Sequence, residues 1–230
     1  SRGLGDVYKR QEGWVVTEPV YVDIYQKGAV VKMYFSAVVD AEPASWGAFC
    51  GEEVFAGERS RTGVGAGVYL RFDTRARRDV GVKIGLSYTS VENARLNMQA
   101  EAADLDFDGA LLAANEAWEE ALGRIRVEGG TAEQQTVFYT ALYHALIHPN
   151  LLSDVNGEYP LMEHSGEVGV TDGERYTVFS LWDTYRNVHQ LLTLVYPERQ
   201  ADMVRSMIGM YEEWGWMPKW ELYGRETFTM

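Results

Sequence analysis

Residues 131–149 of the chain read TAEQQTVFYTALYHALIHP, and this stretch predicts a helix with defined ends. Thr131 is a favoured N-cap residue, and Gln134, three positions later, completes a capping box. Pro149 disfavours a helical conformation for the residue before it, so the helix should stop at His148. The apolar positions between these ends recur on one face: Val137, Phe138, Ala141, Leu142, Ala145 and Leu146. We therefore expect a helical region to begin here.

The sequence after this helix extends the helical pattern. Residues 151–175 contain several Gly and Asp residues and are expected to form a long loop. Residues 176–195 are predicted to be helical again. Pro197, a residue favoured in the first turn of a helix, is predicted to begin another helix that ends near Gly215. Consecutive helices joined by long loops favour a helical barrel or bundle.

Before residue 90 the chain has the pattern of short strands instead. The stretches that are rich in β-branched and aromatic residues, with turn residues between them, are 20–25, 30–39, 67–72 and 80–88. Strands at this spacing favour an antiparallel β-sandwich, of which these residues would form the last part.

Residues 91–130 are expected to form a helical linker between the two regions. Ser90 begins a helical pattern, residues 106–109 are predicted to interrupt it, and residues 124–128 suggest a short strand or an extended segment. The apolar stripe of this linker consists of Leu105, Phe107, Leu111, Leu112, Ala114, Trp118 and Leu122.

The first eleven residues, SRGLGDVYKRQ, are interpreted as a cloning or assembly scar, because they match the translation of a common sequencing-library adaptor. We expect residues 1–11 to make few contacts, with Val7 and Tyr8 exposed. The expected domains are then 12–90, the end of a β-sandwich, 91–130, the helical linker, and 131–230, the start of a helical domain. An open fragment at both ends is also expected, with any signal peptide lying outside it.

The composition excludes some partners. The chain has 34 acidic and 21 basic residues, a formal net charge of −13, and this balance argues against nucleic-acid binding. Its apolar runs are too short to span a membrane. The single cysteine, Cys50, allows no intrachain disulfide and is expected to be a small buried residue rather than a reactive thiol.

Two tryptophan-containing segments suggest a sugar site. Residues 182–186 read WDTYR, and residues 214–222 read WGWMPKWEL. Sugars stack their C–H faces on aromatic rings, and their neighbouring hydroxyls donate to carboxylates, so a Trp beside an Asp or Glu suits them. The structural alternatives are a buried tryptophan with an Asp183–Arg186 pair at helical spacing, and a wall of packed aromatics around Trp214.

Other polar motifs are weaker. His144 and His148 have the i,i+4 spacing of a metal pair but lack an intervening acidic residue of the zincin kind, so exposed or packed histidines are expected. Residues 154–158, DVNGE, lack the full pattern of an EF-hand loop, and a tight Asn-Gly turn is the interpretation adopted.

Taken together, four segments in natural order resemble glycoside hydrolase family 92, the calcium-dependent exo-acting α-mannosidases. They are the end of the sandwich at 82–94, TVFYTALYHALIHPN at 136–150 with SDVNGEY at 153–159, YTVFSLWDTYR at 176–186, and WELYGRET at 220–227. The resemblance runs from about Val80 to Met230. Arg225 stands where the family is associated with Asn, and the strands before Val80 match only loosely.

The resemblance implies an α+β multidomain fold, the C-terminal part of a β-sandwich followed by the first helices of an (α/α)6 barrel. It implies a bacterial enzyme, secreted, periplasmic or on the cell surface, that removes terminal α-mannose from mannose-containing glycans, N-glycans included. Hydrolysis would be inverting, with Ca²⁺ as cofactor. The family's acid and base lie downstream, so no catalytic residue is assigned and the isolated chain should be inactive.

By the same resemblance, Asp183 is the leading substrate-binding candidate, followed by Trp182, Glu221 and Glu226; the metal ligands are unknown. Asp183 and Glu221 are expected to lie close together and to face the open end of the barrel. Two other functions stay open: a non-catalytic carbohydrate-binding or structural helical-barrel module, and another (α/α)6 glycosidase. An acidic residue in a Gly-Asn-Ala-Trp-like context downstream would distinguish enzyme from module.

Overall fold

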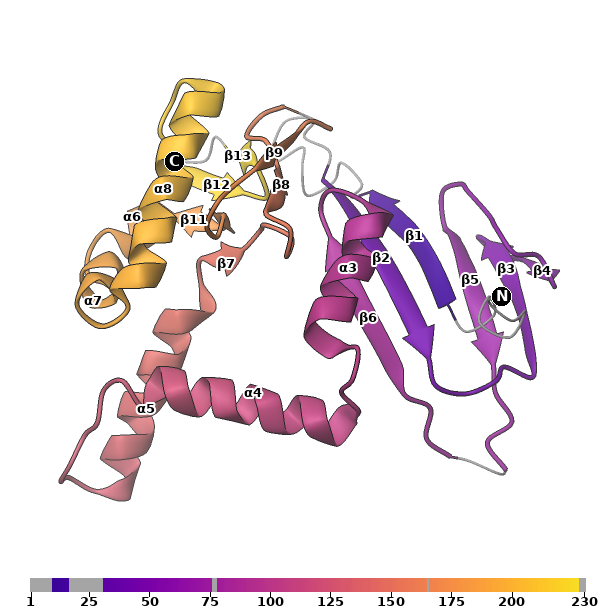
Figure 1. Ribbon diagram of the computed structural model, residues 1–230, viewed down its shortest axis with the longest axis horizontal. Helices are drawn as coiled ribbons and strands as arrows, with labels where there is room; N and C mark the ends of the chain where they lie inside the picture. Colours follow the sequence, from indigo (N-terminus) through magenta and orange to yellow (C-terminus); the bar gives the residue numbers. More distant parts are fainter. Residues whose placement is uncertain (1–9, 17–30, 76–77, 165, 228–230) are drawn as a thin grey trace.

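The structure, a computed structural model, describes residues 10–16, 31–75, 78–164 and 166–227. Figure 1 shows a β part built from the first half of the chain and a part of helices and short strands built from the second, with the long helix α4 running between them. The expected strand at residues 20–25 and the expected exposure of Val7 and Tyr8 lie outside the described residues. The expectation that residues 1–11 make few contacts is wrong for the last two of them, because Arg10 and Gln11 begin β1 and pair with Val38 and Ala37 of the next strand.

The first sheet of the β part is antiparallel, in the order β1-β2-β6, and α3 packs on it (Figure 1). The backbones of β6 and α3 approach so closely that a Cβ atom at Gly85 would lie 1.9 Å from the Ala94 carbonyl oxygen, so only glycine fits there. The elements are β1 (Arg10–Val16), β2 (Lys32–Val39), β6 (Val82–Ser87) and α3 (Val91–Ala102).

The second sheet has the order β4-β3-β5. Its strands are β3 (Ser45–Cys50), β4 (Glu53–Ala56) and β5 (Ala66–Arg71). The strands predicted at 30–39, 67–72 and 80–88 are thus confirmed as β2, β5 and β6, whereas β1, β3 and β4 were not foreseen. Cys50, expected to be buried, is only half-buried because it ends β3 at the sheet's margin, where its thiol lies 3.5 Å from the Val64 carbonyl.

The linker helices form with one shift from expectation. The break falls before residue 106 rather than after it, because Asp106 is the N-cap of α4 (Phe107–Leu122) and its side chain accepts from the Gly109 amide at 2.8 Å. The capping box of Thr131 and Gln134 is confirmed at the start of α5 (Ala132–Ile147). Trp118 of α4 meets Tyr143 of α5 with ring centroids 4.6 Å apart, so the two helices pack near the end of α4.

The helix predicted over residues 176–195 is wrong in its first part. Residues 176–180 form two short strands, β10 (Tyr176–Thr177) and β11 (Phe179–Ser180), separated by Val178 at φ 65°. The helical pattern begins only with α6 (Leu181–Thr184) and α7 (Val188–Val195). The apolar residues of this stretch bury themselves by pairing with distant strands, and this tertiary pairing overrides the helical periodicity.

Five more short strands and one long helix complete the second part of the chain. Strand β7 pairs with β10, β8 with β9, and β11-β12-β13 form one three-stranded sheet. The predicted helix from Pro197 is confirmed as α8 (Pro197–Trp214), which Gly215 ends at φ 87°. The strands are β7 (Asn150–Leu151), β8 (Glu158–Pro160), β9 (Val168–Val170), β12 (Trp220–Leu222) and β13 (Arg225–Glu226).

The main hydrophobic core lies in this second part, between α5, α7, α8 and the short strands. Trp214 packs against it, as its packing alternative supposed, while Trp216 is exposed. The buried members of the core are Leu142, Leu146, Met162, Tyr176, Phe179, Leu192, Tyr196, Met203 and Met210.

A buried carboxylate connects the two parts of the chain. Asp154, next to the Asn-Gly turn, accepts a hydrogen bond from Ser87 Oγ at 2.9 Å and another from Thr89 Oγ1 at 2.5 Å. Ser87 is the last residue of β6, and Thr89 follows two residues later. Asp154 also accepts from Asn93 Nδ2 at 3.0 Å and Asn97 Nδ2 at 2.7 Å, both on α3. The DVNGE segment is therefore a turn, as expected, but one whose aspartate fastens the second part to β6 and α3.

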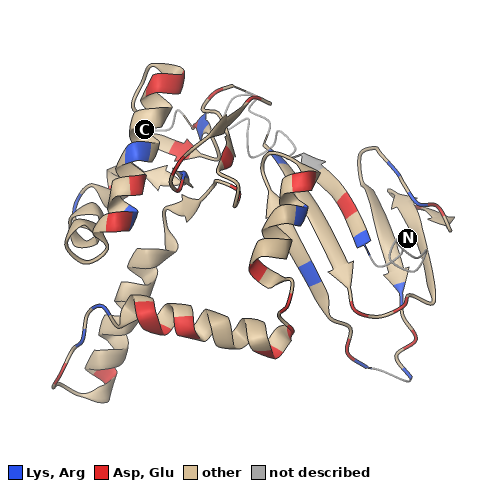
Figure 2. Cartoon of the chain, in the orientation of Figure 1, with Lys and Arg blue, Asp and Glu red and all other residues tan. Residues whose placement is uncertain are grey.

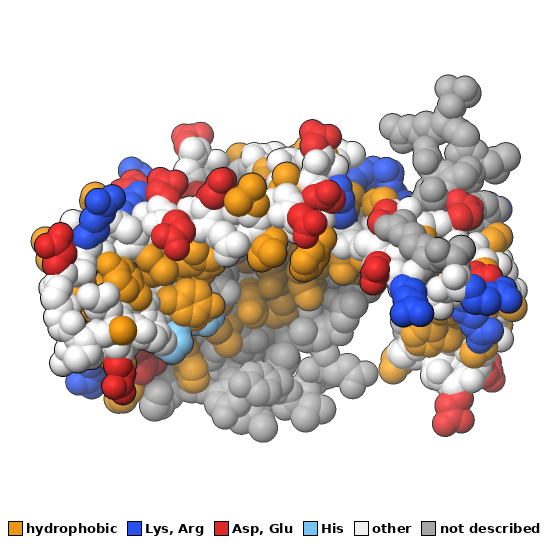
Figure 3. Space-filling view, turned by 90° about the horizontal axis from the view of Figure 1, so that it is seen from below, with side chains coloured by type: hydrophobic (Ala, Val, Ile, Leu, Met, Phe, Trp, Pro, Cys, Tyr) orange, Lys and Arg blue, Asp and Glu red, His pale blue; other side chains and the backbone are white. Residues whose placement is uncertain are grey.

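Helices α4 and α5 keep much apolar surface in contact with solvent. None of the residues of α4 is fully buried, and the middle of its predicted stripe is exposed. Figure 3 views the molecule from below, the side on which α4 and α5 lie in Figure 1, and hydrophobic side chains gather on that face. The exposed large hydrophobics of the two helices are Phe107, Leu111, Leu112, Val137, Tyr143 and Ile147. Apolar surface of this extent is typical of a face that packs against further protein.

Charge and hydropathy fit the sequence analysis. Figure 2 shows Asp and Glu on both parts of the chain, several of them along α4 and α8. Among the helices that the structure describes, none combines the length and the apolar character that a membrane crossing needs.

We predict that Asp154→Ala lowers the free energy of unfolding by about 2–4 kcal/mol, because four donors, two of them on buried residues and two on half-buried ones, lose their acceptor. Urea unfolding followed by tryptophan fluorescence measures this loss. Asp172→Ala, at an exposed position, is the control and should change the stability by less than about 0.5 kcal/mol. Equal small effects at both positions would show that the network does not hold the two parts together.

Candidate functional site

Trp182 and Asp183 lie on α6, the one-turn helix that follows β11, and both are exposed. The hydroxyl of Ser180 donates to Asp183 Oδ2 at 2.5 Å and orients the carboxylate. The Arg186 guanidinium lies 5.2 Å from the centre of the Trp182 ring. The ion pairs found among the described residues do not include one between Asp183 and Arg186, so the salt-bridge alternative does not describe this structure.

Glu221, on β12, is completely enclosed. Its Oε1 accepts from Thr177 Oγ1 at 2.8 Å and from the Gly224 amide at 2.6 Å, and its Oε2 accepts from the Val178 amide at 3.0 Å. Burial raises the pKa of Glu221 to about 7, because a carboxylate removed from water loses its hydration; the hydrogen bonds and Arg175 oppose this effect. The carboxylate therefore connects Thr177 of β10, Val178 between β10 and β11, and Gly224 in the turn after β12.

Glu226, on β13, is also buried. Its carboxylate accepts from the amides of Lys219 at 2.7 Å and Trp220 at 3.2 Å, which lie at the start of β12. Its own amide donates to Glu163 Oε1 at 2.8 Å, and Glu163 forms an ion pair with Arg225 at 2.9 Å. Glu226 thus fastens the two ends of the β12-β13 hairpin to each other.

The structure brings these four residues onto one sheet and its extension. Phe179 of β11 pairs with Glu221, and Glu221 pairs with Glu226 across the hairpin, while α6 continues directly from β11. Exposure divides them: Trp182 and Asp183 are accessible to a ligand, whereas the oxygens of Glu221 and Glu226 are occupied by backbone and threonine donors. Asp183 and Glu221 therefore belong to adjoining elements but do not face solvent together.

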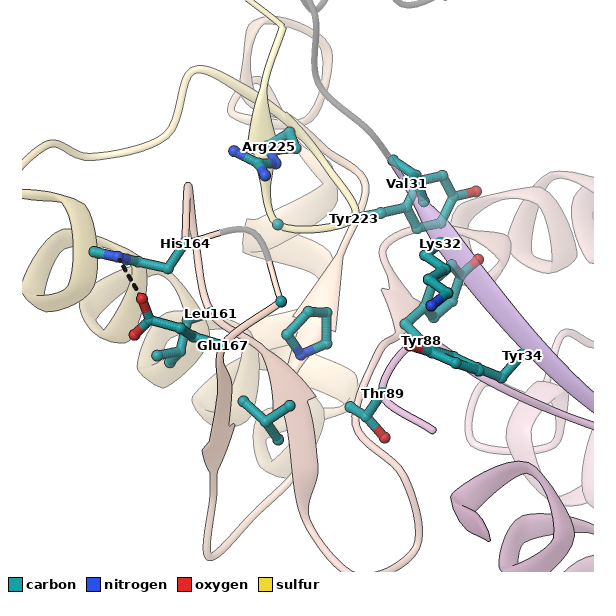
Figure 4. A pocket seen from close by; sticks show the side chains of 14 residues that line it. Val31, Lys32, Tyr34, Tyr88, Thr89, Leu161, His164, Glu167, Tyr223 and Arg225 are labelled. Atoms are coloured by element: carbon teal, nitrogen blue, oxygen red, sulfur yellow. Dashed lines mark ion pairs between the residues drawn. The ribbon is translucent and has the colours of Figure 1, made fainter. Parts of the chain in front are cut away.

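Sequence reasoning missed a groove beside this sheet. A cavity of about 160 Å³ lies where β2 and the end of β6 meet the β8-β9 and β12-β13 turns (Figure 4). Tyr88 and Tyr223 stack there with centroids 5.1 Å apart, and burial raises the pKa of Tyr88 to about 12. Figure 4 also shows Lys32 and Tyr34 on the β side of the groove. The signals in the sequence were Tyr88, at the end of the predicted strand 80–88, and Tyr223, inside the WELYGRET segment.

The described residues do not fit a calcium cage. Ca²⁺ takes six to eight oxygen ligands, usually with several carboxylates. Within the described ranges, no group of three or more His, Cys, Asp or Glu side chains converges on one point. His144 is exposed in the last turn of α5, and His148, also exposed, is the C-cap residue that follows it.

Comparison with known proteins identifies the family. The model of the glycosyl hydrolase family 92 catalytic domain matches residues 93–230, more than half of the chain. The chain belongs to glycoside hydrolase family 92. The matched region begins within α3 and includes α6 and the β11-β12-β13 sheet.

Solved structures agree with this assignment. The family GH92 α-mannosidase BT3965 from Bacteroides thetaiotaomicron, also solved with mannoimidazole, superimposes with a TM-score of 0.82 at 28% identity, over 100% of this chain and 30% of its own. The GH92 inverting mannosidase BT2199 from the same organism gives 0.83 at 28% identity, over 98% of this chain and 30% of its own. The mixed α+β fold thus matches part of GH92 mannosidase structures.

A third relative is matched over a smaller share of its own length. An uncharacterized secreted glycosidase of Arthroderma benhamiae is 30% identical over an alignment of 130 residues, which covers 53% of this chain and 16% of that protein. The chain therefore spans under a third of the length of each of these relatives.

The raised pKa of Glu221 predicts how stability depends on pH. Its pKa is about 7 in the folded chain and 4.5 for the free group, so between these values only the folded chain keeps the proton. The contribution of Glu221 to stability is full below about pH 4.5 and is lost as the pH rises through about 7.

Glu221→Gln removes this titration. The difference in unfolding free energy between the wild type and the variant should therefore be largest near about pH 5 and shrink toward about pH 8, by roughly 3 kcal/mol at most. Urea unfolding of both proteins across this range measures it. A difference that stays constant with pH would show that Glu221 does not titrate there.

Proposed function

We propose that the chain is part of a glycosidase that removes terminal α-linked mannose from glycans by inverting, calcium-assisted hydrolysis. The observation that carries the proposal is the exposed Trp182–Asp183 pair, held on a buried carboxylate framework within a family 92 catalytic region. The inverting mannosidase and the mannoimidazole complex among the structural relatives support mannose as the sugar.

Trp182 and Asp183 are the proposed sugar contacts. An indole ring offers an apolar face for the C–H groups of a pyranose, and an exposed carboxylate accepts hydrogen bonds from two neighbouring hydroxyls. Ser180 restricts the rotation of the Asp183 side chain, so less freedom is lost when the sugar binds. Glu221 and Glu226 support this pair from the adjoining strands, since their oxygens already have donors in the protein.

The catalytic acid and base are proposed to lie outside this chain. Inverting hydrolysis requires one carboxylic acid that protonates the leaving oxygen and one carboxylate that activates water, on opposite faces of the sugar. We assign neither role to a residue of this chain. What this part supplies is the binding and orientation of the terminal sugar.

Calcium is proposed for the longer protein only, because the described residues offer no cluster of ligands for it. A bound calcium ion would bind sugar hydroxyl groups and hold the ring for reaction. The ligands would come from other segments.

The arrangement of domains is likewise a proposal. The two sheets before Ser90 would be the end of a β-sandwich, residues 91–130 the linker, and residues 131–230 the start of an (α/α)6 barrel. The exposed apolar residues of α4 and α5 support this placement, because further barrel helices would cover them. The secreted relative supports a location outside the cytoplasm, and mannose-containing glycans are the proposed partners.

We predict that the full-length protein releases mannose from an α-mannobiose, that a calcium chelator reduces this activity, and that the 230-residue chain releases none. Release of mannose is measured by coupled assay with both proteins, with and without the chelator. Activity of the 230-residue chain would place the acid and base within it. A full-length protein that binds mannosides without cleaving them would favour a carbohydrate-binding module, and chelator-insensitive release would exclude the calcium role.

In the full-length protein, Asp183→Asn and Trp182→Ala should each raise KM by about tenfold or more, because each removes a sugar contact worth about 1–2 kcal/mol. The exposed Asp172 provides the matched control, and Asp172→Asn should leave KM unchanged. Steady-state kinetics with the α-mannobiose measure KM and kcat of each variant. Wild-type KM in both site variants would remove Trp182 and Asp183 from the sugar site.

A further inference from the structure

Two residues beside the Trp182–Asp183 pair have a backbone conformation that L-amino acids rarely adopt. Val178 has φ 65° and Tyr223 has φ 52°. A β-branched residue such as valine is a pronounced outlier in this region, and such strain persists only where the surroundings enforce it. At Val178 the chain passes from β10, which pairs with β7, to β11 of the β11-β12-β13 sheet, and at Tyr223 it reverses direction between the antiparallel strands β12 and β13.

One side chain holds both positions. Glu221 accepts from the Val178 amide at 3.0 Å and from the Gly224 amide, directly after Tyr223, at 2.6 Å. Thr177 completes the connection, because its hydroxyl donates to Glu221 at 2.8 Å and accepts from the Tyr223 amide at 2.7 Å. The two strained steps are therefore joined to each other through the buried Glu221 carboxylate and the buried Thr177 hydroxyl. We call the five residues that take part the Glu221 clamp: Thr177, Val178, Glu221, Tyr223 and Gly224.

The clamp determines where the exposed residues lie. Val178 is followed by the two residues of β11 and then by α6, so its backbone angle sets the direction in which Trp182 and Asp183 are presented. On the other side, the turn places Tyr223 against Tyr88 in the groove of Figure 4. A substitution of Glu221 would thus alter the position of the Trp182–Asp183 pair and of the Tyr223 side of the groove, although Glu221 lies on neither surface.

We infer that Glu221 is a positioning residue, which fixes the Trp182–Asp183 pair and the Tyr223 turn relative to each other by holding Val178 and Tyr223 in their strained conformations. Above its pKa of about 7 Glu221 is ionised and only accepts hydrogen bonds, and this suits it to the role because the three groups that face it are all donors; the experiments below are therefore done at about pH 8. A glutamine would present an NH₂ group to at least one of these donors and lose the arrangement. The effect on sugar binding rests on the proposed function; the clamp itself does not.

The first experiment is independent of activity. Hydrogen–deuterium exchange of the 230-residue chain, wild type and Glu221→Gln, should show faster exchange of the variant in peptides spanning residues 177–184 and 221–226, with α5 unchanged. Glu116→Gln, exposed on α4, is the matched control and should exchange as the wild type does. An increase spread evenly over α5 and α8, or no increase at residues 177–184, would overturn the inference.

The second experiment uses the full-length protein and separates positioning from general stability. Glu221→Gln should raise KM for an α-mannobiose by about tenfold with a smaller change in kcat, because it weakens binding of the sugar. In the Val178→Gly background the same substitution should raise KM by less than about threefold, because glycine adopts a positive φ without strain and needs no clamp. Equal factors in both backgrounds would contradict the inference. If the full-length wild-type protein releases no mannose, the proposed function is wrong. The hydrogen–deuterium exchange experiment then still tests whether Glu221 holds the two strained positions.

A second pair of variants covers the case in which Glu221→Gln does not fold. Thr177→Val removes the hydroxyl at nearly constant volume, and Thr177→Ser keeps it. The valine variant should reproduce the local exchange increase and the rise in KM, and the serine variant should restore both toward the wild type. If the two variants behave alike in these measurements, the hydroxyl does not act through the clamp and the inference is wrong.

Discussion

A carboxylate that is wholly removed from water is the constraint on which the site of this chain depends. Glu221 has no contact with solvent, so each of its oxygens must find donors within the protein. It finds them on two segments far apart in the sequence, the Thr177–Val178 step and the Gly224 turn. Burying the charge is unfavourable, as the raised pKa of Glu221 shows, and three hydrogen bonds offset part of this cost. The same bonds hold two strained backbone steps that would not persist alone.

The same physical device occurs where the two parts of the chain meet. Asp154 is buried among hydroxyl and amide donors from the end of β6, the residues just after it and α3. Neutral donors give directional hydrogen bonds, so the network specifies one orientation of the β part rather than a general attraction. That orientation brings Tyr88 against Tyr223, and with it the groove beside the β11-β12-β13 sheet. Two buried carboxylates therefore connect the fold of the β part to the presentation of Trp182 and Asp183.

Local signals in the sequence predicted the elements whose causes are local. The Thr131 capping box, the Pro197 helix start and the strands β2, β5 and β6 follow from residues within a few positions of each other. Residues 176–180 were predicted wrongly because their pairing partners, Asn150–Leu151 and Trp220–Glu221, lie far away along the chain. The chemistry of a residue could likewise be predicted but its exposure could not: Asp183 and Glu221 both stand in tryptophan-containing segments, yet only the fold decides that Asp183 is accessible and Glu221 is enclosed.

The division of roles between an accessible pair and an enclosed framework is the central claim, and a crystal structure of the full-length protein with a mannose-mimicking inhibitor tests it most directly. The account predicts that the sugar ring stacks on Trp182 and that Asp183 accepts hydrogen bonds from its hydroxyls. It also predicts that Glu221 keeps its bonds to Thr177, Val178 and Gly224 and does not touch the ligand. An inhibitor bound directly to the Glu221 carboxylate, with Trp182 and Asp183 remote from it, would contradict the account.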